Sequence, residues 1–261
     1  MTQPLLDMQH VDISYGGKPV VQDLSLQMAP GEILGIVGES GSGKSTVLKA
    51  AMGLLENSGA VTRGDIYYKG QNVTDSRENE LRKLRGPEMG MIFQNTGASM
   101  CPIRTIDDQL YESVLEHEKI SRKEIKERAL KLFETMRLTD GERILKSYPF
   151  ELSGGMNQRV GIMMAMVPNP RLLLADEPTS ALDVTVQVQV VKEMMKMREL
   201  YGTAIAIVTH NIGVVEYMAD KVAVMYQGKL VEYGRKEDVI RHPREPYTRK
   251  LIGAVPRLDR G

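Results

Sequence analysis

Apolar and polar positions alternate with a period of two through much of the N-terminal part of the chain, as they do in half-buried β-strands. Residues 6–14 and 20–28 alternate in this way, and residues 16–19, Gly-Gly-Lys-Pro, have the composition of a hairpin turn. Residues 61–69 predict another strand of the same set. A short apolar run at 89–93 predicts a buried strand that ends at Gln94. The N-terminal part therefore predicts an antiparallel β subdomain.

The spacing of apolar residues becomes helical between residues 105 and 146, in a region that is otherwise polar. The apolar positions at near-helical spacing are Leu110, Val114, Ile125, Ala129, Leu132, Phe133 and Met136. This region carries no chemical motif of its own, although it lies between segments that do. We therefore expect a helical lobe inserted into the core.

Helices and strands alternate after residue 150. Helices are predicted at 156–167, 184–201 and 212–218, and strands at 171–176, 203–209, 222–225 and 229–233. Such alternation implies a parallel sheet with helices on both faces. Two short helical pieces are expected in the tail, around 242–243 and at 247–254.

A glycine-rich loop, GESGSGKST, follows an apolar strand at 32–37 and precedes a predicted helix at 44–54. This is the context in which such a loop cradles a phosphate, because curled backbone N–H groups and a helix N-terminus point at one anion. Lys44 can then reach the β- and γ-phosphates of a nucleoside triphosphate, and the Ser45 hydroxyl can hold Mg²⁺. The predicted nucleotide-binding residues are Gly38, Glu39, Ser40, Gly41, Ser42, Gly43, Lys44, Ser45 and Thr46. A glycine turn that only caps a helix is the alternative.

Two acidic residues, Asp176 and Glu177, close the apolar strand at 171–176. Beside a phosphate loop, Asp176 would bind Mg²⁺ directly or through water, and Glu177 would polarise the attacking water as a general base. In isolation they could be two exposed acids at a strand end. The phosphate loop in the same chain favours the catalytic interpretation.

A second anion site is predicted where Ser153 and the N–H groups of Gly154 and Gly155 open a helix. The chain has one phosphate loop and therefore one triphosphate, so this second site indicates contact with the nucleotide of another subunit. By itself the segment could be a common N-cap turn. Its position about 20 residues before the acidic strand end favours the nucleotide contact.

Composition narrows the partners and the compartment. Among 261 residues, Lys and Arg together number 34 and Asp and Glu also number 34, which gives no support to nucleic acid as a partner. The single cysteine, Cys101, excludes a disulfide within the chain and fits a reducing cytoplasm. The first residues lack the basic and apolar regions of a signal peptide. Apolar runs are far shorter than the roughly 20 residues that span a bilayer, so another chain would hold this one at a membrane.

The ordered motifs resemble those of the ATP-binding subunits of ABC transporters over essentially the whole chain. The matching positions are the P-loop at 38–46, Gln94 of the Q-loop, the signature at 152–156, the Walker B strand ending in Asp176 and Glu177, the D-loop at 180–183 and the switch histidine His210. The resemblance implies an α/β fold: a P-loop NTPase (RecA-like) core with an antiparallel β subdomain and an inserted helical subdomain. It also implies ATP and Mg²⁺ as cofactors, and ATP hydrolysis coupled to solute import.

The resemblance assigns roles to further positions. Tyr15 lies where an aromatic ring stacks on adenine, and Gln94 would contact Mg²⁺ or water and report to the membrane subunits. His210 would bond the γ-phosphate and orient the water with Glu177, and Asp183 would link the two sites across the dimer. Individually, Tyr15 could be an ordinary strand-end aromatic, Gln94 a polar loop residue and His210 a structural cap. The ordered set favours the catalytic roles.

Three stretches resemble the branch of this family that imports oligopeptides, dipeptides and nickel. These are LSGGMNQR from residue 152, LDVTVQ at 182–187, and the tail, HPREPYTR at 242–249 with Ala254-Val-Pro256. A generic capping helix is the alternative for the tail. Asn211 follows the switch histidine where aspartate is usual, and it can still cap the next helix.

The resemblance implies one ABC ATPase domain over residues 1–261, with the core and β subdomain at 1–94 and 151–240, a helical subdomain at about 95–150 and a tail at about 241–261. The expected partners are a second ATP-binding subunit, homologous or identical, two membrane permease subunits and an extracytoplasmic solute-binding protein. The chain would lie peripherally at the cytoplasmic face of the cell membrane. The cargo would be a peptide, nickel or a metal–chelator complex.

Two other functions were weighed against import. An ABC ATPase of nucleic-acid repair or translation would resemble two ATPase domains in one chain or carry a long inserted coiled coil. This chain has one P-loop, and residues 95–150 are too short for such a coiled coil. A P-loop kinase or soluble switch would leave 152–155 and His210 without a role. The sequence therefore favours import.

Overall fold

The structure, a computed structural model, describes residues 3–56, 58–180 and 182–254. The chain forms two compact units, one made of the residues up to Ser76 and from Ala206 onward, the other of Arg77–Ile205. The boundary between the units falls within strand β8 (Ala204–Val208). The domain boundaries expected from the sequence stay a prediction.

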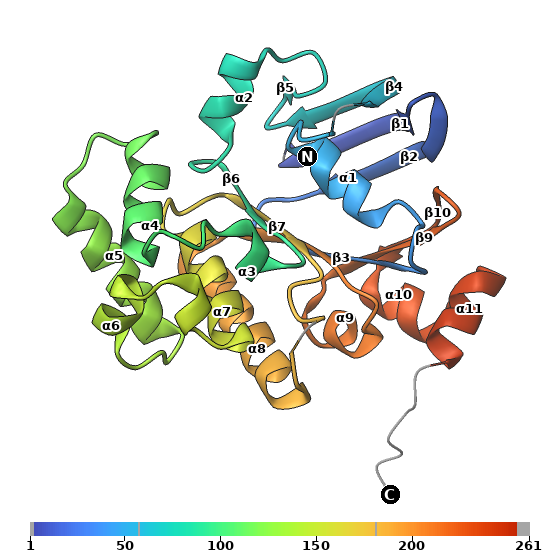
Figure 1. Ribbon diagram of the computed structural model, residues 1–261. Helices are drawn as coiled ribbons and strands as arrows, with labels where there is room; N and C mark the ends of the chain where they lie inside the picture. Colours follow the sequence, from blue (N-terminus) through green and yellow to red (C-terminus); the bar gives the residue numbers. More distant parts are fainter. Residues whose placement is uncertain (1–2, 57, 181, 255–261) are drawn as a thin grey trace, which may run out of the picture. The chain divides into compact units, whose positions relative to one another are not determined.

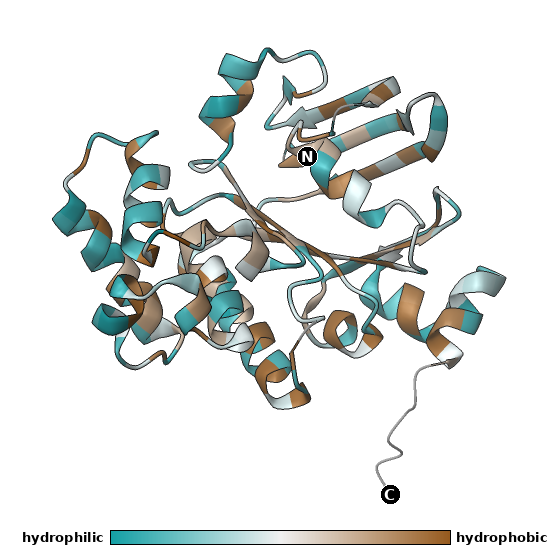
Figure 2. Ribbon diagram, in the orientation of Figure 1, coloured by the Kyte–Doolittle hydropathy of each residue, from teal (hydrophilic) through white to brown (hydrophobic). Residues whose placement is uncertain are grey.

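The first unit contains an antiparallel sheet, as the sequence predicts, and its strand order is β2-β1-β4-β5. Its strands are β1 (Leu6–Tyr15), β2 (Lys18–Met28), β4 (Gly59–Tyr68) and β5 (Gln71–Asn72). Bands of polar and apolar residues alternate along β1 and β2 in Figure 2. The hairpin turn is shorter than the predicted residues 16–19, because Tyr15 already pairs with Lys18. Both turn residues, Gly16 and Gly17, have positive φ, a conformation that favours glycine.

A second sheet places the glycine loop. In the first unit it contains β3 (Ile33–Gly38), which is parallel to β9 (Lys221–Tyr226), and β10 (Lys229–Arg235), which is antiparallel to β9. Every residue of β3 is buried. Helix α9 (Ile212–Met218) packs on β3 so closely that a Cβ on Gly35 would lie 2.6 Å from Cγ1 of Val215. The loop therefore leaves a fully buried strand, which lies beside β9 (Figure 1).

Helix α1 (Lys44–Ala51) ends before residue 54, where the sequence predicted its end. Gly53 adopts a left-handed conformation with φ 62°. The Leu54 N–H then bonds the Lys49 carbonyl at 2.8 Å, and the Gly53 N–H bonds the Ala50 carbonyl at 2.9 Å. These bonds close the helix with a glycine turn, which the periodicity of the side chains does not reveal.

Two helices end the described chain, α10 (Lys236–Arg241) and α11 (Pro246–Gly253). The prediction of a helical piece around 242–243 is wrong, because Pro243 disfavours a helical conformation at His242 and α10 stops at Arg241. Residues 255 and 256 of the predicted tail motif lie outside the described residues.

The second unit contains the parallel pair β6 (Met89–Ile92) and β7 (Leu172–Asp176). Its helices are α2 (Glu78–Leu84), α3 (Thr96–Ser99), α4 (Ile106–Leu115), α5 (Arg122–Thr135), α6 (Gly141–Lys146), α7 (Gly154–Met166) and α8 (Val184–Tyr201), with a short 3₁₀ turn at Pro149–Glu151. All seven apolar positions predicted between 105 and 146 are buried. Helix α2 escaped prediction because it is short and buries only Leu81 and Leu84. Within the described residues, none of the helices combines the length and apolar character needed to cross a bilayer.

A buried ion pair joins α7 to α8. Nη2 of Arg159 lies 2.5 Å from Oε1 of Glu193, and the two side chains are 11% and 6% exposed. The same guanidinium donates a hydrogen bond to the carbonyl of Met136, at the end of α5. Burial raises the pKa of Glu193, while the hydrogen bond from Arg159 opposes that rise. The pair fixes the helix whose first turn follows Ser153.

Replacing Glu193 with alanine should lower the free energy of unfolding by about 3–5 kcal/mol, because it leaves the Arg159 guanidinium buried without its carboxylate. Chemical denaturation of the purified chain measures this loss. Glu199→Ala, at an exposed position of the same helix, is the control and should change stability by less than about 0.5 kcal/mol. A Glu193→Ala variant as stable as the wild type would contradict this account.

Candidate functional site

The glycine loop is shaped by close backbone contacts with neighbouring strands. A Cβ on Gly38 would lie 2.1 Å from the carbonyl oxygen of Met225 in β9, and one on Gly43 would lie 2.9 Å from Cγ2 of Val21 in β2. The φ angles of Gly38, Gly41 and Gly43 are 150°, 78° and 96°. No side chain fits at positions 38 and 43 without displacing these neighbours, so glycine is required there.

Two polar side chains face the inside of this loop. The Lys44 ammonium, on a residue only 6% exposed, donates to the carbonyls of Gly38 at 2.9 Å and of Glu39 at 2.7 Å. The Ser42 hydroxyl is buried and finds no hydrogen-bond partner within the described residues. A buried hydroxyl in this state fits a loop built to receive an oxygen-rich ligand, because buried polar groups are normally paired. Ser45 and Thr46 follow in the first turn of α1.

Tyr15 is the last residue of β1. The strand that pairs with β1 is β2, and it contains Val21, which lies against Gly43. The Tyr15 ring packs on the backbone of Gly59, where an added Cβ would lie 2.7 Å from Cε1 of the tyrosine. Tyr15 is half-buried, so one part of the ring is supported and another part remains accessible.

His210 follows β8, in the first unit. The Thr209 N–H just before it bonds the Ile36 carbonyl of β3 at 3.2 Å, which places the end of β8 beside the strand that carries the glycine loop. Asn211 caps α9 by accepting the Gly213 N–H at 3.0 Å, which confirms the predicted cap. His210 is exposed.

The acidic pair lies in the second unit. Asp176 is the last residue of β7 and is 6% exposed. Glu177 has a positive φ of 45°, an uncommon conformation for a residue other than glycine, and its carbonyl accepts hydrogen bonds from both N and Oγ of Ser180 at 3.2 Å. Strain of this kind concentrates at functional sites.

Gln94 and Asp176 lie at the same edge of the parallel pair, because Ile92 of β6 is opposite Ala175 of β7. Ligands of α/β proteins bind at the carboxyl ends of strands. Mg²⁺ prefers oxygen ligands, and within the second unit the amide of Gln94 and the carboxylate of Asp176 have that chemistry. The third predicted ligand, Ser45, belongs to the first unit.

Two helix starts in the second unit carry the predicted subunit contacts. Ser153 is the N-cap of α7 and accepts the Met156 N–H at 3.3 Å, so Gly154 and Gly155 form the first turn of a helix, as predicted. Asp183 caps α8 by accepting the Val186 N–H at 3.0 Å. Ala181 of the D-loop lies outside the described residues.

The sequence did not reveal the link between the Gln94 segment and α7. Helix α3 follows Gln94, and its Thr96 donates a hydrogen bond to the buried Gln158 of α7 at 2.8 Å. A Cβ on Gly161 would lie 2.0 Å from Cγ2 of Thr96, so α3 can sit here only on a glycine. An isolated glycine within a helical pattern was the available signal for such a contact.

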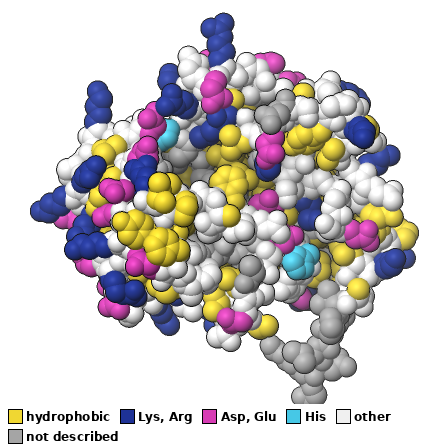
Figure 3. All heavy atoms as spheres, viewed as in Figure 1, with side chains coloured by type: hydrophobic (Ala, Val, Ile, Leu, Met, Phe, Trp, Pro, Cys, Tyr) yellow, Lys and Arg dark blue, Asp and Glu magenta, His cyan; other side chains and the backbone are white. Residues whose placement is uncertain are grey.

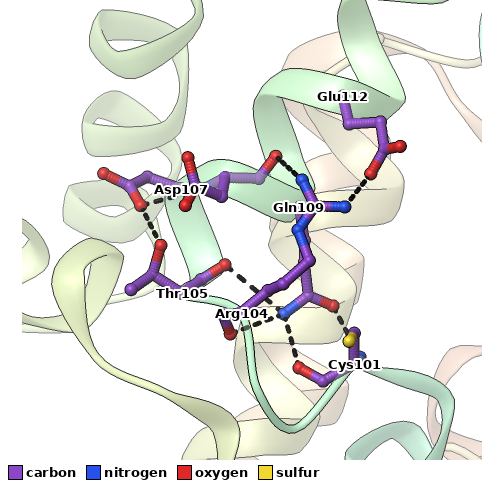
Figure 4. Close-up of polar contacts among 7 residues, drawn as sticks. Cys101, Arg104, Thr105, Asp107, Gln109 and Glu112 are labelled. Atoms are coloured by element: carbon purple, nitrogen blue, oxygen red, sulfur yellow. Dashed lines mark hydrogen bonds and ion pairs between the residues drawn. The ribbon is translucent and has the colours of Figure 1, made fainter.

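The loop before α4 is held by one side chain, Gln109 (Figure 4). Its amide nitrogen donates to the carbonyls of Cys101 at 3.1 Å and Arg104 at 3.0 Å, and its oxygen accepts the Cys101 N–H at 2.7 Å. Arg104 also pairs with Glu112 of α4. This ordered loop exposes 82% of Ile103.

Comparison with known proteins places this site in a family. The family model described as ABC transporter matches residues 21–180, and the one described as oligopeptide/dipeptide transporter, C-terminal region, matches residues 231–261. The chain is 44% identical over 261 residues to the probable D,D-dipeptide transport ATP-binding protein DdpD of Escherichia coli K12, covering 98% of this chain and 80% of the relative. It is 42% identical over 260 residues to the oligopeptide transport ATP-binding protein OppD of Bacillus subtilis 168, covering 98% and 73%.

Solved structures agree with this assignment. The ATP-binding cassette MJ0796, solved as a dimer in a post-hydrolysis state with ADP and phosphate, superposes with a TM-score of 0.78 at 28% identity, covering 88% of this chain and 98% of that one. The cbiO1 protein of Clostridium perfringens, part of an ABC transporter complex, shares the fold with a TM-score of 0.80 at 24% identity, covering 92% of each chain. The glycine loop, the ordered motifs and these matches together show that the chain belongs to the ABC transporter family, as an ATP-binding ATPase subunit with the oligopeptide/dipeptide transporter C-terminal region.

Proposed function

We propose that this chain powers an ABC importer by binding and hydrolysing ATP, and that the imported solutes are peptides. The glycine loop, with Lys44 held inside it and the buried Ser42 hydroxyl without a partner in the described residues, carries the ATP-binding part of the proposal. Peptides are favoured over nickel and metal–chelator complexes because DdpD and OppD are named for dipeptide and oligopeptide transport and because residues 231–261 match a region of peptide transporters.

ATP would lie with its phosphates in the glycine loop and its adenine on the exposed part of the Tyr15 ring. The N–H groups from Ser40 to Thr46 would surround the phosphates, with the helix dipole of α1 favouring their negative charge. Ser45, Gln94 and Asp176 would hold Mg²⁺, which when bound neutralises charge on the phosphate oxygens.

Hydrolysis would depend on residues at the strand ends. Glu177 accepts a proton from the attacking water, and His210 bonds the γ-phosphate and keeps the water in line for attack. Gln94 would contact the water or Mg²⁺ and transmit its state through α3, which is packed on Gly161 of α7. Gln94, α3 and α7 would then move together.

A second ATP-binding subunit would complete the site. The positive end of α7 at Ser153, Gly154 and Gly155 would meet the γ-phosphate held by the partner's glycine loop. The dimer of MJ0796 with ADP and phosphate supports the pairing of two ATP-binding subunits. Asp183 would connect the two sites across the dimer, whose second subunit is either another copy or a homologous ATPase.

Two permease subunits would change conformation in response to ATP binding and hydrolysis, and they would hold the chain at the cytoplasmic face of the membrane. Exposed apolar side chains in the helical region, Ile103 at 82% and Phe150 at 73%, are suited to such a contact. Gln109 of α4 bonds the carbonyls of Cys101 and Arg104, on either side of Ile103 (Figure 4), so a displacement of the permease would be coupled to a displacement of α4. An extracytoplasmic solute-binding protein would deliver the peptide.

Action on nucleic acid is less well supported. Lys and Arg side chains are interspersed with Asp and Glu over the face shown in Figure 3, and the charges of the whole chain balance. Proteins that bind nucleic acid depend on a continuous cationic surface to neutralise phosphates. The balanced charge of the chain therefore gives no support to nucleic acid as a partner.

Replacing Lys44 with methionine should weaken MgATP binding about ten- to hundredfold, because one charge-assisted hydrogen bond to phosphate contributes about 1.5–3 kcal/mol. Titration calorimetry of the purified chain measures the dissociation constant. Lys49→Met, on the same helix and paired with Glu56, is the matched control and should bind as the wild type does. Equal affinities for the wild type and Lys44→Met would remove Lys44 from the site.

Glu177→Gln should still bind MgATP but lower turnover by about 10²–10⁴, because the general base is lost while the shape of the side chain is kept. We expect it to accumulate as an ATP-bound dimer, measured by size-exclusion chromatography with light scattering. Glu199→Gln is the control and should hydrolyse normally. If only monomer is found with ATP and Mg²⁺, even with the cognate partner ATPase present, the dimer proposal fails.

The cargo is tested through the solute-binding protein that we propose as a partner of this importer. We expect it to bind di- or oligopeptides and the reconstituted importer to hydrolyse ATP faster when the peptide-loaded protein is added. Nickel salts and metal–chelator complexes serve as the comparison ligands. Binding of these instead of peptides would overturn the proposed cargo while leaving the ATPase proposal intact.

A further inference from the structure

A tyrosine near the C-terminal end of the described chain contacts the glycine loop directly. The hydroxyl oxygen of Tyr247, in the first turn of α11, accepts the backbone N–H of Glu39 at 3.0 Å. Both residues belong to the first unit, although 208 positions separate them in the sequence.

The ring of Tyr247 is held by a second tyrosine. It stacks on Tyr226, with ring centroids 4.1 Å apart and an interplanar angle of 29°. Tyr226 ends β9 directly after Met225, the residue whose carbonyl excludes a side chain at Gly38. The same strand end therefore supports both the start of the glycine loop and the ring that reaches toward it.

The turn that presents Tyr247 is tied down by charged side chains. The Glu232 carboxylate of β10 accepts the backbone N–H groups of Arg244 at 2.8 Å and Glu245 at 3.3 Å. Arg249 donates from its guanidinium to the carbonyls of Pro243 at 3.0 Å and Arg244 at 2.9 Å. These hydrogen bonds fix the turn that places the Tyr247 hydroxyl against the glycine loop.

The peptide unit between Gly38 and Glu39 is consequently held at both of its polar atoms. Its N–H, which belongs to Glu39, bonds Tyr247, and its C=O, which belongs to Gly38, accepts the ammonium of Lys44 at 2.9 Å. Loss of the tyrosine hydroxyl would let this peptide rotate, and the carbonyl that places the Lys44 ammonium would move with it. An apolar contact would not constrain rotation in this way, since it has no preferred direction.

We propose that Tyr247 is a positioning residue that holds the glycine loop in the conformation that accepts a triphosphate, so that the C-terminal region contributes to ATP affinity. This inference rests on the proposed binding of ATP at the loop. It assigns a task to the oligopeptide/dipeptide transporter C-terminal region, residues 231–261, which lies beyond the ABC transporter match at 21–180.

Tyr247→Phe removes the hydroxyl and keeps the stacked ring. We expect it to weaken MgATP binding about two- to tenfold, the effect of one net hydrogen bond. Tyr233→Phe is the matched control, because the Tyr233 hydroxyl also bonds a backbone group, that of Gln27, away from the loop. Both variants should lower the melting temperature of the nucleotide-free chain by a similar amount, at most about 4 °C. Only Tyr247→Phe should lose affinity. In the assembled ATPase its KM for ATP should rise while kcat stays within about twofold.

Three results would overturn the inference. Tyr247→Phe binding MgATP like the wild type would show that the hydroxyl has no effect on the loop. Equal losses of affinity in Tyr247→Phe and Tyr233→Phe would show a general loss of stability instead of positioning. A wild-type chain that binds no MgATP would refute the proposed function itself, whereas the first two results leave it standing.

Discussion

The close approach of backbone to backbone beneath the glycine loop is the constraint on which the rest of the site depends. Position 38 leaves β3 so near the Met225 carbonyl of β9 that a Cβ would stand 2.1 Å from it. Position 43 is similarly confined by Val21 of β2. The loop curls because its glycines can occupy this space, and curling turns its N–H groups toward one point. Without the packing of β3 among its neighbours, the same sequence would be a flexible turn.

Hydrogen bonds then select one conformation of this loop. The Lys44 ammonium bonds the carbonyls of Gly38 and Glu39, and the Tyr247 hydroxyl bonds the N–H of Glu39. Each bond is modest in water, and the one between Lys44 and the Gly38 carbonyl is buried, so breaking it would leave buried polar groups unsatisfied. The loop is therefore organised before any phosphate arrives, which lowers the entropy that a ligand must remove on binding.

Side-chain caps at the N-termini of helices are a second feature that recurs in this structure. Ser153, Asp183 and Asn211 each cap a helix with their own side chain, and each lies in or next to a segment for which we propose a role at the nucleotide. An N-cap fixes the direction in which the first N–H groups of a helix point. Ordered packing behind the cap keeps that direction constant: Arg159 and Glu193 lock α7 to α8, and Gly161 lets α3 lie against α7. In the function that we propose, this packing would let a change at Gln94 reach the Ser153 end of α7.

The sequence by itself determined the features that depend on near neighbours. The glycine loop, the alternation in β1 and β2, the helical spacing between 105 and 146 and the caps at Ser153 and Asn211 are local, because periodicity and capping involve residues a few positions apart. Errors of boundary, such as the end of α1, came from a glycine turn that side-chain periodicity does not record. Only the tertiary structure decided the contact of Tyr247 with Glu39, the burial of Arg159 against Glu193 and the need for glycine at 161. These contacts depend on which distant segments the fold brings together. The sequence shows that a hydroxyl, a charged group or a glycine is present, but it does not show which residue that group will contact.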